Sequence, residues 1–222
     1  MKNSKQYAER IQKLYRRLKR DYPKVQQACF DEPVEAIVYA IISENTTEAA
    51  SQSISKKSAE YFVDLNELRA SKSEEIAELL GESYPAAKET AAKLTKILTA
   101  IFNQHHKLSL QALKKIGKRP AKQALEKLEG ISEFAVDYCM LTSLQAHAIP
   151  LTETMVGYLK GSSLVDPGAD RQDIEGFLTR QIAAKDAYEF YNLLRRESES
   201  AAPKKRASHK IEKTAKADRA AD

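Results

Sequence analysis

The segment LEGISEFAVDYCML, residues 128–141, carries the feature that decides the fold. The apolar periodicity of the preceding residues stops at Gly130, and a new apolar run starts within a few residues. Glycine ends helices and permits tight turns, and a serine such as Ser132 can cap the helix that follows. The segment therefore predicts two helices joined by a short hairpin, within residues 120–145.

Helical patterns also predominate outside the hairpin. Residues 4–20 place apolar side chains on one face at helical spacing, and Pro33 can open a second, nearly all-apolar core helix. No segment shows the confident alternation of a β-strand. The sequence predicts an all-α protein of about ten helices, the others near residues 47–63, 72–80, 85–105, 120–128, 132–145, 152–161, 170–183 and 185–197.

Composition narrows the class of protein further. The chain has 222 residues, long enough to bury a real core, and its two cysteines, Cys29 and Cys139, make neither a disulfide framework nor a metal-ligand spacing. We expect both cysteines to be buried in a reducing compartment. The charged N-terminus and the lack of a run of about 20 apolar residues predict a cytoplasmic protein without a membrane span. The histidines show no ligand spacing, so no metal site or cofactor is expected.

The net charge of +5 is unevenly distributed. Residues 1–24 hold nine Lys or Arg and two acids, residues 198–222 hold seven and four, and the body between them holds 20 and 25. Basic ends on a mildly acidic body suggest an anionic partner met by the ends. A soluble protein with a disordered tail would show the same charge distribution. Residues 198–222 have too few large apolar side chains to fold, so we expect them to form such a tail.

Three segments, in this order and spacing, resemble the helix-hairpin-helix (HhH-GPD) DNA glycosylase superfamily, whose best-known branch is endonuclease III. SENTTEAA (43–50) is similar to a polar segment that follows a buried helix in that family. LEGISEFAV (128–136) is similar to the family's hairpin, and IPLTETMVGYL (149–159) falls where the family has an aspartate before a helix. The resemblance covers about three quarters of the chain.

The resemblance implies a two-lobed helical fold, here without an iron–sulfur cluster because no cysteine follows Cys139. Residues 33–147 would form a central bundle. Residues 1–32 and 148–197 would form the second lobe, and residues 198–222 a disordered basic tail. The expected partner is duplex DNA, bound by a monomer in the cytoplasm, or at the nucleoid if the source is bacterial.

Departures from the family pattern fall on its catalytic positions. Phe134 stands where lyase-competent members have a nucleophilic lysine, and phenylalanine has no nitrogen to form a Schiff base. Thr152 stands where nearly all members have an aspartate. The next residue, Glu153, could supply the missing carboxylate after a shift of one position, or could simply interact with the dipole of the helix it begins.

The resemblance also implies a set of DNA contacts. A glycine turn and the start of the following helix bring backbone amides to a phosphate. Asn45 falls where the family has a polar wedge that fills the gap left by a flipped base, although it also fits a simple loop before a helix cap. The hairpin replaces the family's second glycine by Ser132 and a frequently basic position by Glu133. The expected DNA-contacting residues are Asn45, Gly130, Ile131, Ser132 and Phe134.

Three functions remain open from the sequence. The first is a DNA-binding protein of the base-excision-repair glycosylase superfamily that lacks lysine-dependent lyase activity. Such a protein could be a pseudoenzyme, with no catalytic activity at all. The second is an active monofunctional glycosylase that uses Glu153. The third is a helical interaction protein that no longer binds DNA, which the acidic body and Glu133 would suit.

Overall fold

The computed structural model describes residues 4–202, and these fold into eleven α-helices and two short 3-10 helices. No strand occurs in this range, so the all-α prediction is confirmed. The α-helices are α1 (Ser4–Asp21), α2 (Pro33–Ser43), α3 (Glu48–Tyr61), α4 (Leu65–Ala70), α5 (Ser73–Leu80), α6 (Ala87–His105), α7 (Lys118–Glu126), α8 (Glu133–Thr142), α9 (Glu153–Gly161), α10 (Arg171–Gln181) and α11 (Ala187–Ala201). The 3-10 helices are η1 (Gln111–Lys115) and η2 (Ala184–Asp186).

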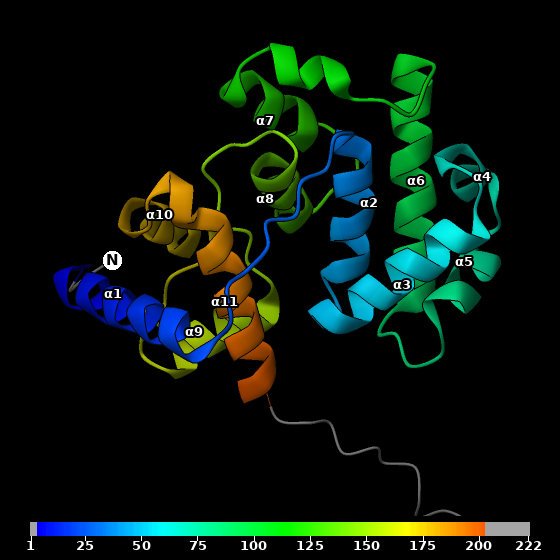
Figure 1. Cartoon of the computed structure of the whole chain (residues 1–222). Coiled ribbons are helices and arrows are strands. Elements are labelled where there is room, and N and C mark those ends of the chain that lie inside the picture. Colours follow the sequence, from blue (N-terminus) through cyan, green and yellow to red (C-terminus); the bar gives the residue numbers. More distant parts are fainter. Residues whose placement is uncertain (1–3, 203–222) are drawn as a thin grey trace, which may run out of the picture.

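Two groups of helices lie side by side, as the two-lobed prediction requires (Figure 1). Helices α2 to α8 form one group, in which α2 packs on α3, α6 and α8. Helices α1, α9, α10 and α11 form the other, with α11 in contact with α1 and α9. Because α8 also contacts α11, the hairpin's second helix lies where the two groups meet. The exact residue boundaries expected for the lobes stay a prediction.

Local sequence signals account for many of the helix ends. Pro33 opens α2, and α1 ends at Asp21, two residues before Pro23. Thr47 and Ser132 cap α3 and α8, accepting hydrogen bonds from the backbone amides of Ala50 (3.3 Å) and Ala135 (3.2 Å). Each cap satisfies an amide that the first turn of a helix leaves without a partner.

Three expectations were wrong. Helix α4 lies in a segment where no helix was predicted; Asp64 caps it through the amides of Asn66 and Glu67. Cys29 is exposed, because the segment between α1 and α2 runs over the surface, whereas Cys139 is buried as expected. Helix α11 continues to Ala201, so the predicted tail does not start at residue 198. The buried Ser198 hydroxyl donates to the carbonyl of Arg195 at 2.8 Å, and residues 203–222 lie outside the described range.

The basic helix α1 meets acidic residues of α11. Arg17 pairs with Glu197 (N–O distance 2.5 Å) and Lys19 pairs with Glu189 (3.0 Å). These pairs are partly exposed, so each stabilises the protein by less than about 1 kcal/mol. Their main consequence is electrostatic, since part of the positive charge expected to face an anionic partner is already neutralised. No described helix is long and apolar enough to cross a membrane.

Candidate nucleic-acid interface

The hairpin turn has the geometry that its sequence predicts. Gly130 has a φ angle of +87°, and the amide of Ile131 donates to the carbonyl of Leu128 at 3.1 Å to close the turn. A Cβ atom added at Gly130 would meet only the Lys96 side chain, at 3.9 Å. Glycine is therefore required for its backbone conformation and not for lack of space.

The start of α8 presents a possible anion site beside this turn. Within residues 4–202, the backbone amides of Ser132 and Glu133 have no hydrogen-bond acceptor. Gly130 and Glu133 are exposed, and Ile131 and Ser132 are half-buried. Amides at a helix start, together with the positive end of the helix dipole, can hold a phosphate. The sequence-predicted residues Gly130, Ile131 and Ser132 thus lie together in an accessible turn.

Acidic side chains compete with an anion at the same place. Glu129 accepts a hydrogen bond from Lys96 of α6 at 2.7 Å, and both side chains are exposed. This contact lowers the pKa of Glu129. Glu44 accepts from the hydroxyl of Ser132 (2.8 Å) and from Lys93 (3.0 Å). The two lysines that α6 brings toward the turn are therefore each paired with a carboxylate.

Phe134, in the first turn of α8, is buried, unlike the accessible hairpin turn beside it. Its side chain and backbone are fully buried, so direct contact between Phe134 and DNA is not available in this structure. Its ring packs on Tyr138 at a centroid distance of 5.9 Å. Tyr138 in turn stacks on Tyr39 of α2 (5.5 Å) and meets Tyr191 of α11 edge-on (5.8 Å). Tyr39 and Tyr138 are both buried, so the lysine position of the resemblance lies inside an aromatic cluster.

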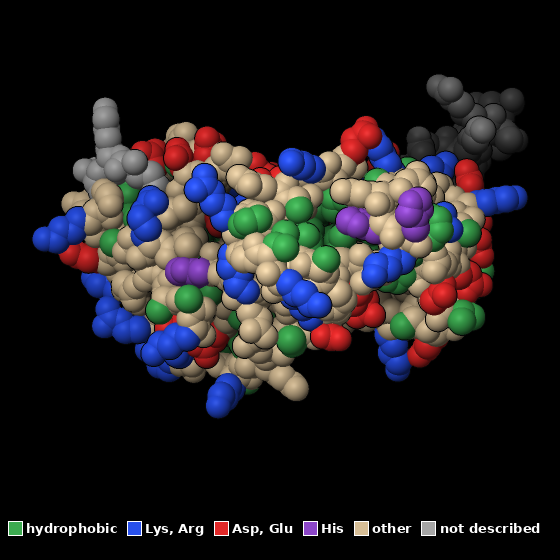
Figure 2. Space-filling model, turned by 90° about the horizontal axis from the view of Figure 1, so that it is seen from above, with side chains coloured by type: hydrophobic (Ala, Val, Ile, Leu, Met, Phe, Trp, Pro, Cys, Tyr) green, Lys and Arg blue, Asp and Glu red, His purple; other side chains and the backbone are tan. Residues whose placement is uncertain are grey.

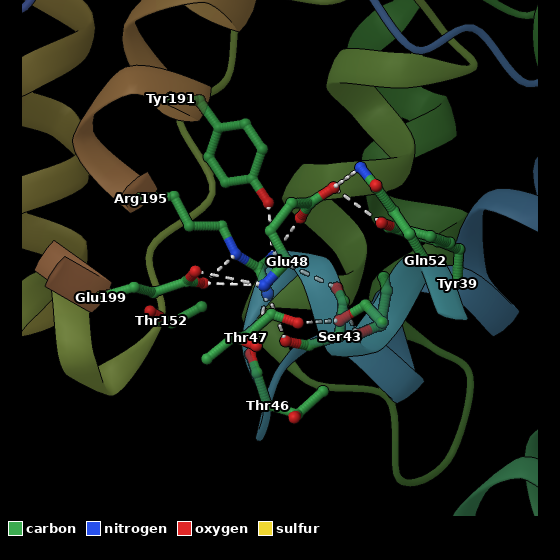
Figure 3. A network of polar contacts seen from close by, with 12 residues as sticks. Tyr39, Ser43, Thr46, Thr47, Glu48, Gln52, Thr152, Tyr191, Arg195 and Glu199 are labelled. Carbon is green, nitrogen blue, oxygen red and sulfur yellow. Dashed lines mark hydrogen bonds and ion pairs between the residues drawn. The ribbon is translucent and has the colours of Figure 1, made fainter. Parts of the chain in front are cut away.

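A buried ion network continues from this cluster (Figure 3). Arg195 of α11 is 1% exposed and donates to the carbonyls of Ser43 (2.7 Å) and Thr46 (3.0 Å) at the end of α2. It also donates to the hydroxyl of Tyr191 (2.8 Å) and to Glu199 (2.8 Å). The guanidinium group therefore bridges the two groups of helices.

Glu48, at the start of α3, completes the network. Its carboxylate lies 3.3 Å from Arg195 and accepts hydrogen bonds from Tyr39 (2.7 Å) and Gln52 (3.2 Å). Its backbone amide donates to Glu199 at 3.0 Å. Burial alone would lower the pKa of Arg195, but Tyr191, Glu48 and Glu199 raise it above its usual value. Arg195 is thus a permanently charged group that holds two carboxylates.

Sequence reasoning missed Arg195, Glu48 and Glu199. A signal for Arg195 existed, because it follows Tyr188 and Tyr191 at the spacing of one helix face, where its neighbours are apolar. A charged residue at such a position needs a buried partner. One partner, Glu199, stands four residues on, a spacing that a local pattern can identify. The acceptors at Ser43 and Thr46 lie about 150 positions away along the chain, so no local pattern could identify them.

Thr152 and Glu153 occupy the start of α9. Thr152 is 5% exposed and caps the helix, its hydroxyl accepting from the amide of Met155 at 3.3 Å. The Glu153 side chain is 85% exposed and pairs with Arg171 of α10. Glu153 therefore faces solvent, and its carboxylate is paired with the guanidinium group of Arg171. Whether it acts in catalysis stays a prediction, and its position in the first turn of a helix is also explained by the helix dipole.

The loop between α2 and α3 contains the expected wedge residue. Asn45 is exposed at the tip of this loop, while Arg195 binds the loop's backbone from within through the carbonyls of Ser43 and Thr46. A rigid loop with an exposed polar tip suits the role of a wedge, and it equally suits a helix-capping loop.

A cavity of about 380 Å³ lies beside the hairpin. Phe134 and Leu151 contribute apolar wall, and Lys122 pairs there with the buried Asp137 at 2.9 Å. Burial raises the pKa of Asp137, with Lys122 acting in the opposite direction. Burial and the nearby Asp137 also raise the pKa of Glu175, which lines the same cavity.

The raised pKa of Asp137 predicts a measurable pH dependence. A carboxyl whose pKa is higher in the folded than in the unfolded state binds more protons when folded, so stability falls as pH rises through that window. Asp137→Asn removes this fall. Urea unfolding at pH 4 and pH 7 should show that wild type loses more stability than Asp137→Asn over the interval. The exposed Glu126→Gln serves as control, and parallel behaviour of wild type and Asp137→Asn would contradict the prediction.

No metal centre is indicated in the described part of the chain, where no group of three or more His, Cys, Asp or Glu side chains could hold an ion.

Comparison with solved structures defines the class: the chain has the all-helical fold of the helix-hairpin-helix DNA glycosylases. It is similar to endonuclease III in a trapped covalent DNA intermediate, with 14% identity over 84% of each chain and a TM-score of 0.66. It is also similar to a non-covalent endonuclease III–DNA complex (15% identity, 85% of this chain and 84% of that chain, TM-score 0.64).

A third similar structure is the 3-methyladenine DNA glycosylase of H. pylori bound to 1,N6-ethenoadenine (15% identity, 89% of this chain and 97% of that chain, TM-score 0.64). No protein-family model and no curated protein matches the sequence. At these identities the similarity establishes the fold, and the chemistry has to be inferred from this chain's own residues.

Proposed function

We propose that this protein binds duplex DNA through the hairpin turn and does not act as a lysine-dependent lyase. The observation that carries the proposal is the contrast between two neighbouring parts of one hairpin. Gly130 and the start of α8 are accessible to a phosphate, whereas Phe134 is fully buried in an aromatic cluster. The DNA complexes of the similar endonuclease III structures support the choice of ligand.

Lyase chemistry needs an uncharged amine, which lysine supplies only when its pKa is lowered. Lys122 is the lysine that lines the cavity beside Phe134. Desolvation would lower its pKa, but the hydrogen bond and charge of Asp137 outweigh this effect and raise it. Lys122 is thus held in its protonated form and is a poor nucleophile. This supports a role without lysine-dependent lyase chemistry.

Two measurements test the proposal together. Affinity for a short duplex should fall steeply with salt concentration, because phosphate contacts release counterions. Borohydride treatment with duplex containing an abasic site should trap no covalent complex. Absence of binding even at low salt would overturn the DNA-binding proposal and favour an interaction protein. A trapped complex would overturn the assignment as a non-lyase.

The Glu129–Lys96 pair gives a sharper prediction. Lys96 lies beside Gly130 but is held by Glu129. Glu129→Gln should free it and raise duplex affinity several-fold, on the order of the modest strength of an exposed pair. Lys96→Gln should lower affinity and reduce the salt slope by about 1. Fluorescence anisotropy over a salt series measures both effects.

The exposed pair Lys56–Glu60 of α3 provides a matched control for this experiment. Glu60→Gln changes the net charge by the same amount at a distant helix. Equal effects of Glu60→Gln and Glu129→Gln would mean that only net charge matters, and the hairpin turn would lose its assigned role.

A further inference from the structure

The body of the protein contains a strongly basic stretch that its overall acidity conceals. Residues 90–125 hold eight Lys or Arg and no Asp or Glu. Two of these lysines, on α6, are paired with acids at the hairpin turn. The second half of the stretch is folded elsewhere, around the end of α6, η1 and the start of α7.

This second half forms one exposed face, named here the basic end. Seven of its side chains are basic or histidine and all are exposed: His105, His106, Lys107, Lys114, Lys115, Lys118 and Arg119. The face is seen in Figure 2, where Lys and Arg side chains surround a central hydrophobic area and acidic side chains lie mostly toward the rim. Ile116, 44% exposed, lies in the middle of this sequence.

Hydrogen bonds join residues 109–111 of the basic end to Asp31 and Glu32, the two residues that precede α2. Glu32 accepts from the amide of Leu110 (2.8 Å) and from the hydroxyl of Ser109 (2.8 Å). Gln111 donates to the carbonyl of Asp31 at 2.7 Å. The surface is therefore preorganised, which reduces the entropy lost when it binds a ligand.

Several cations of this surface have no acid partner. Lys114 pairs with Asp31 at 2.9 Å, and Lys118 donates to the carbonyl of Leu144. Within residues 4–202, Lys107, Lys115 and Arg119 form no ion pair. Three unpaired cations on a rigid surface repel one another. Binding of a polyanion relieves this electrostatic repulsion.

We propose that the basic end is a second DNA-binding surface, which contacts phosphates of a duplex other than the one at the hairpin turn. The choice of duplex DNA as ligand rests on the proposed function. The two surfaces lie at opposite ends of α2. The basic end is hydrogen-bonded to Glu32, the residue before its start, and Ser132 of the hairpin turn is hydrogen-bonded to Glu44, the residue after its end. Ile116 is the one large hydrophobic side chain exposed in residues 105–119, which is too little for insertion into a lipid surface. One molecule can then hold two duplexes at once.

The test uses the triple variant Lys107→Gln/Lys115→Gln/Arg119→Gln. Its matched control is Lys57→Gln/Lys72→Gln/Lys185→Gln, which removes three exposed cations from scattered positions. One readout is capture of a fluorescent duplex, through the protein, on beads that carry a second duplex. The other is the salt slope of binding to a single short duplex.

Wild type and the control should capture the second duplex, and the triple variant should capture at least about tenfold less. Each phosphate contact contributes about 0.9 to the salt slope, so the slope attributed to this surface should fall by up to about three. Capture and slope of the triple variant equal to those of the control would overturn the proposal. Failure of wild type to capture a second duplex would also overturn it.

A hairpin variant separates this proposal from the proposed function. Lys96→Glu reverses an exposed charge beside Gly130 and leaves the basic end intact. It should abolish capture while binding to one duplex through the basic end persists. If Lys96→Glu changes neither measurement but the triple variant abolishes binding, the hairpin assignment fails and the basic end is the DNA-binding surface.

Discussion

Arg195→Ala is expected to lower the free energy of unfolding by about 3–5 kcal/mol, the range typical of removing one partner from a buried ion pair. The guanidinium group is 1% exposed and satisfies the carbonyls of Ser43 and Thr46. Alanine would leave both carbonyls without this donor. It would also leave the carboxylates of Glu48 and Glu199 close together without their shared cation. Urea unfolding at neutral pH measures the loss.

Two further variants show whether the effect comes from this network. Arg196→Ala removes the exposed neighbouring charge and should change stability by less than about 0.5 kcal/mol. Arg195→Lys keeps a positive charge but lacks the planar fork that reaches several acceptors, so it should fall between wild type and alanine. A loss below about 1 kcal/mol for Arg195→Ala would show that the network contributes little to folding.

The same substitution has a local consequence. Arg195 is a link from α11 to the loop that presents Asn45. Without it, amide hydrogen exchange in the loop and in the first turn of α3 should accelerate more than exchange in α6. Unchanged exchange would mean that the capping bond of Thr47 alone holds the loop.

Much of the fold follows from short-range sequence signals. Gly130, Pro33 and the capping residue Ser132 mark helix ends that the structure confirms, because each acts through its own backbone or the next three residues. Cys29 was misplaced because nothing in its neighbours tells a surface-running segment from a buried one. Helix α4, only six residues long, is too short to show a helical period.

The candidate site was less predictable, for a physical reason. The absence of an amine at Phe134 is a property of one side chain and can be read from the sequence. What fills the space around it depends on Tyr39, Tyr191 and Arg195, which come from two other helices. The net charge of the 173-residue body is negative and does not reveal that its basic residues are clustered. The cluster is visible in the sequence as the stretch 90–125, which contains no Asp or Glu.

Phe134→Lys is expected to destabilise the protein by about 3–5 kcal/mol at pH 7 and to leave it without lyase activity. The substituted side chain is fully buried among aromatic rings, so it loses packing and brings an amine into an apolar site. Burial lowers the pKa of such a lysine, and the unfolded chain then binds more protons than the folded one. Stability should therefore recover in part as pH rises from 7 to 10. Urea unfolding at several pH values measures this.

Phe134→Leu keeps the site apolar and should cost less, with no rise of stability relative to wild type between pH 7 and 10. The decisive comparison is borohydride trapping on abasic duplex. If loss of the lysine alone had removed the activity, Phe134→Lys would yield a trapped complex. We expect none, because Tyr138 packs on this position and the adjoining space between the helix groups is occupied by Tyr191, Arg195 and Glu48. A trapped complex would show that this packing opens for DNA and that the fold retains a usable lesion pocket.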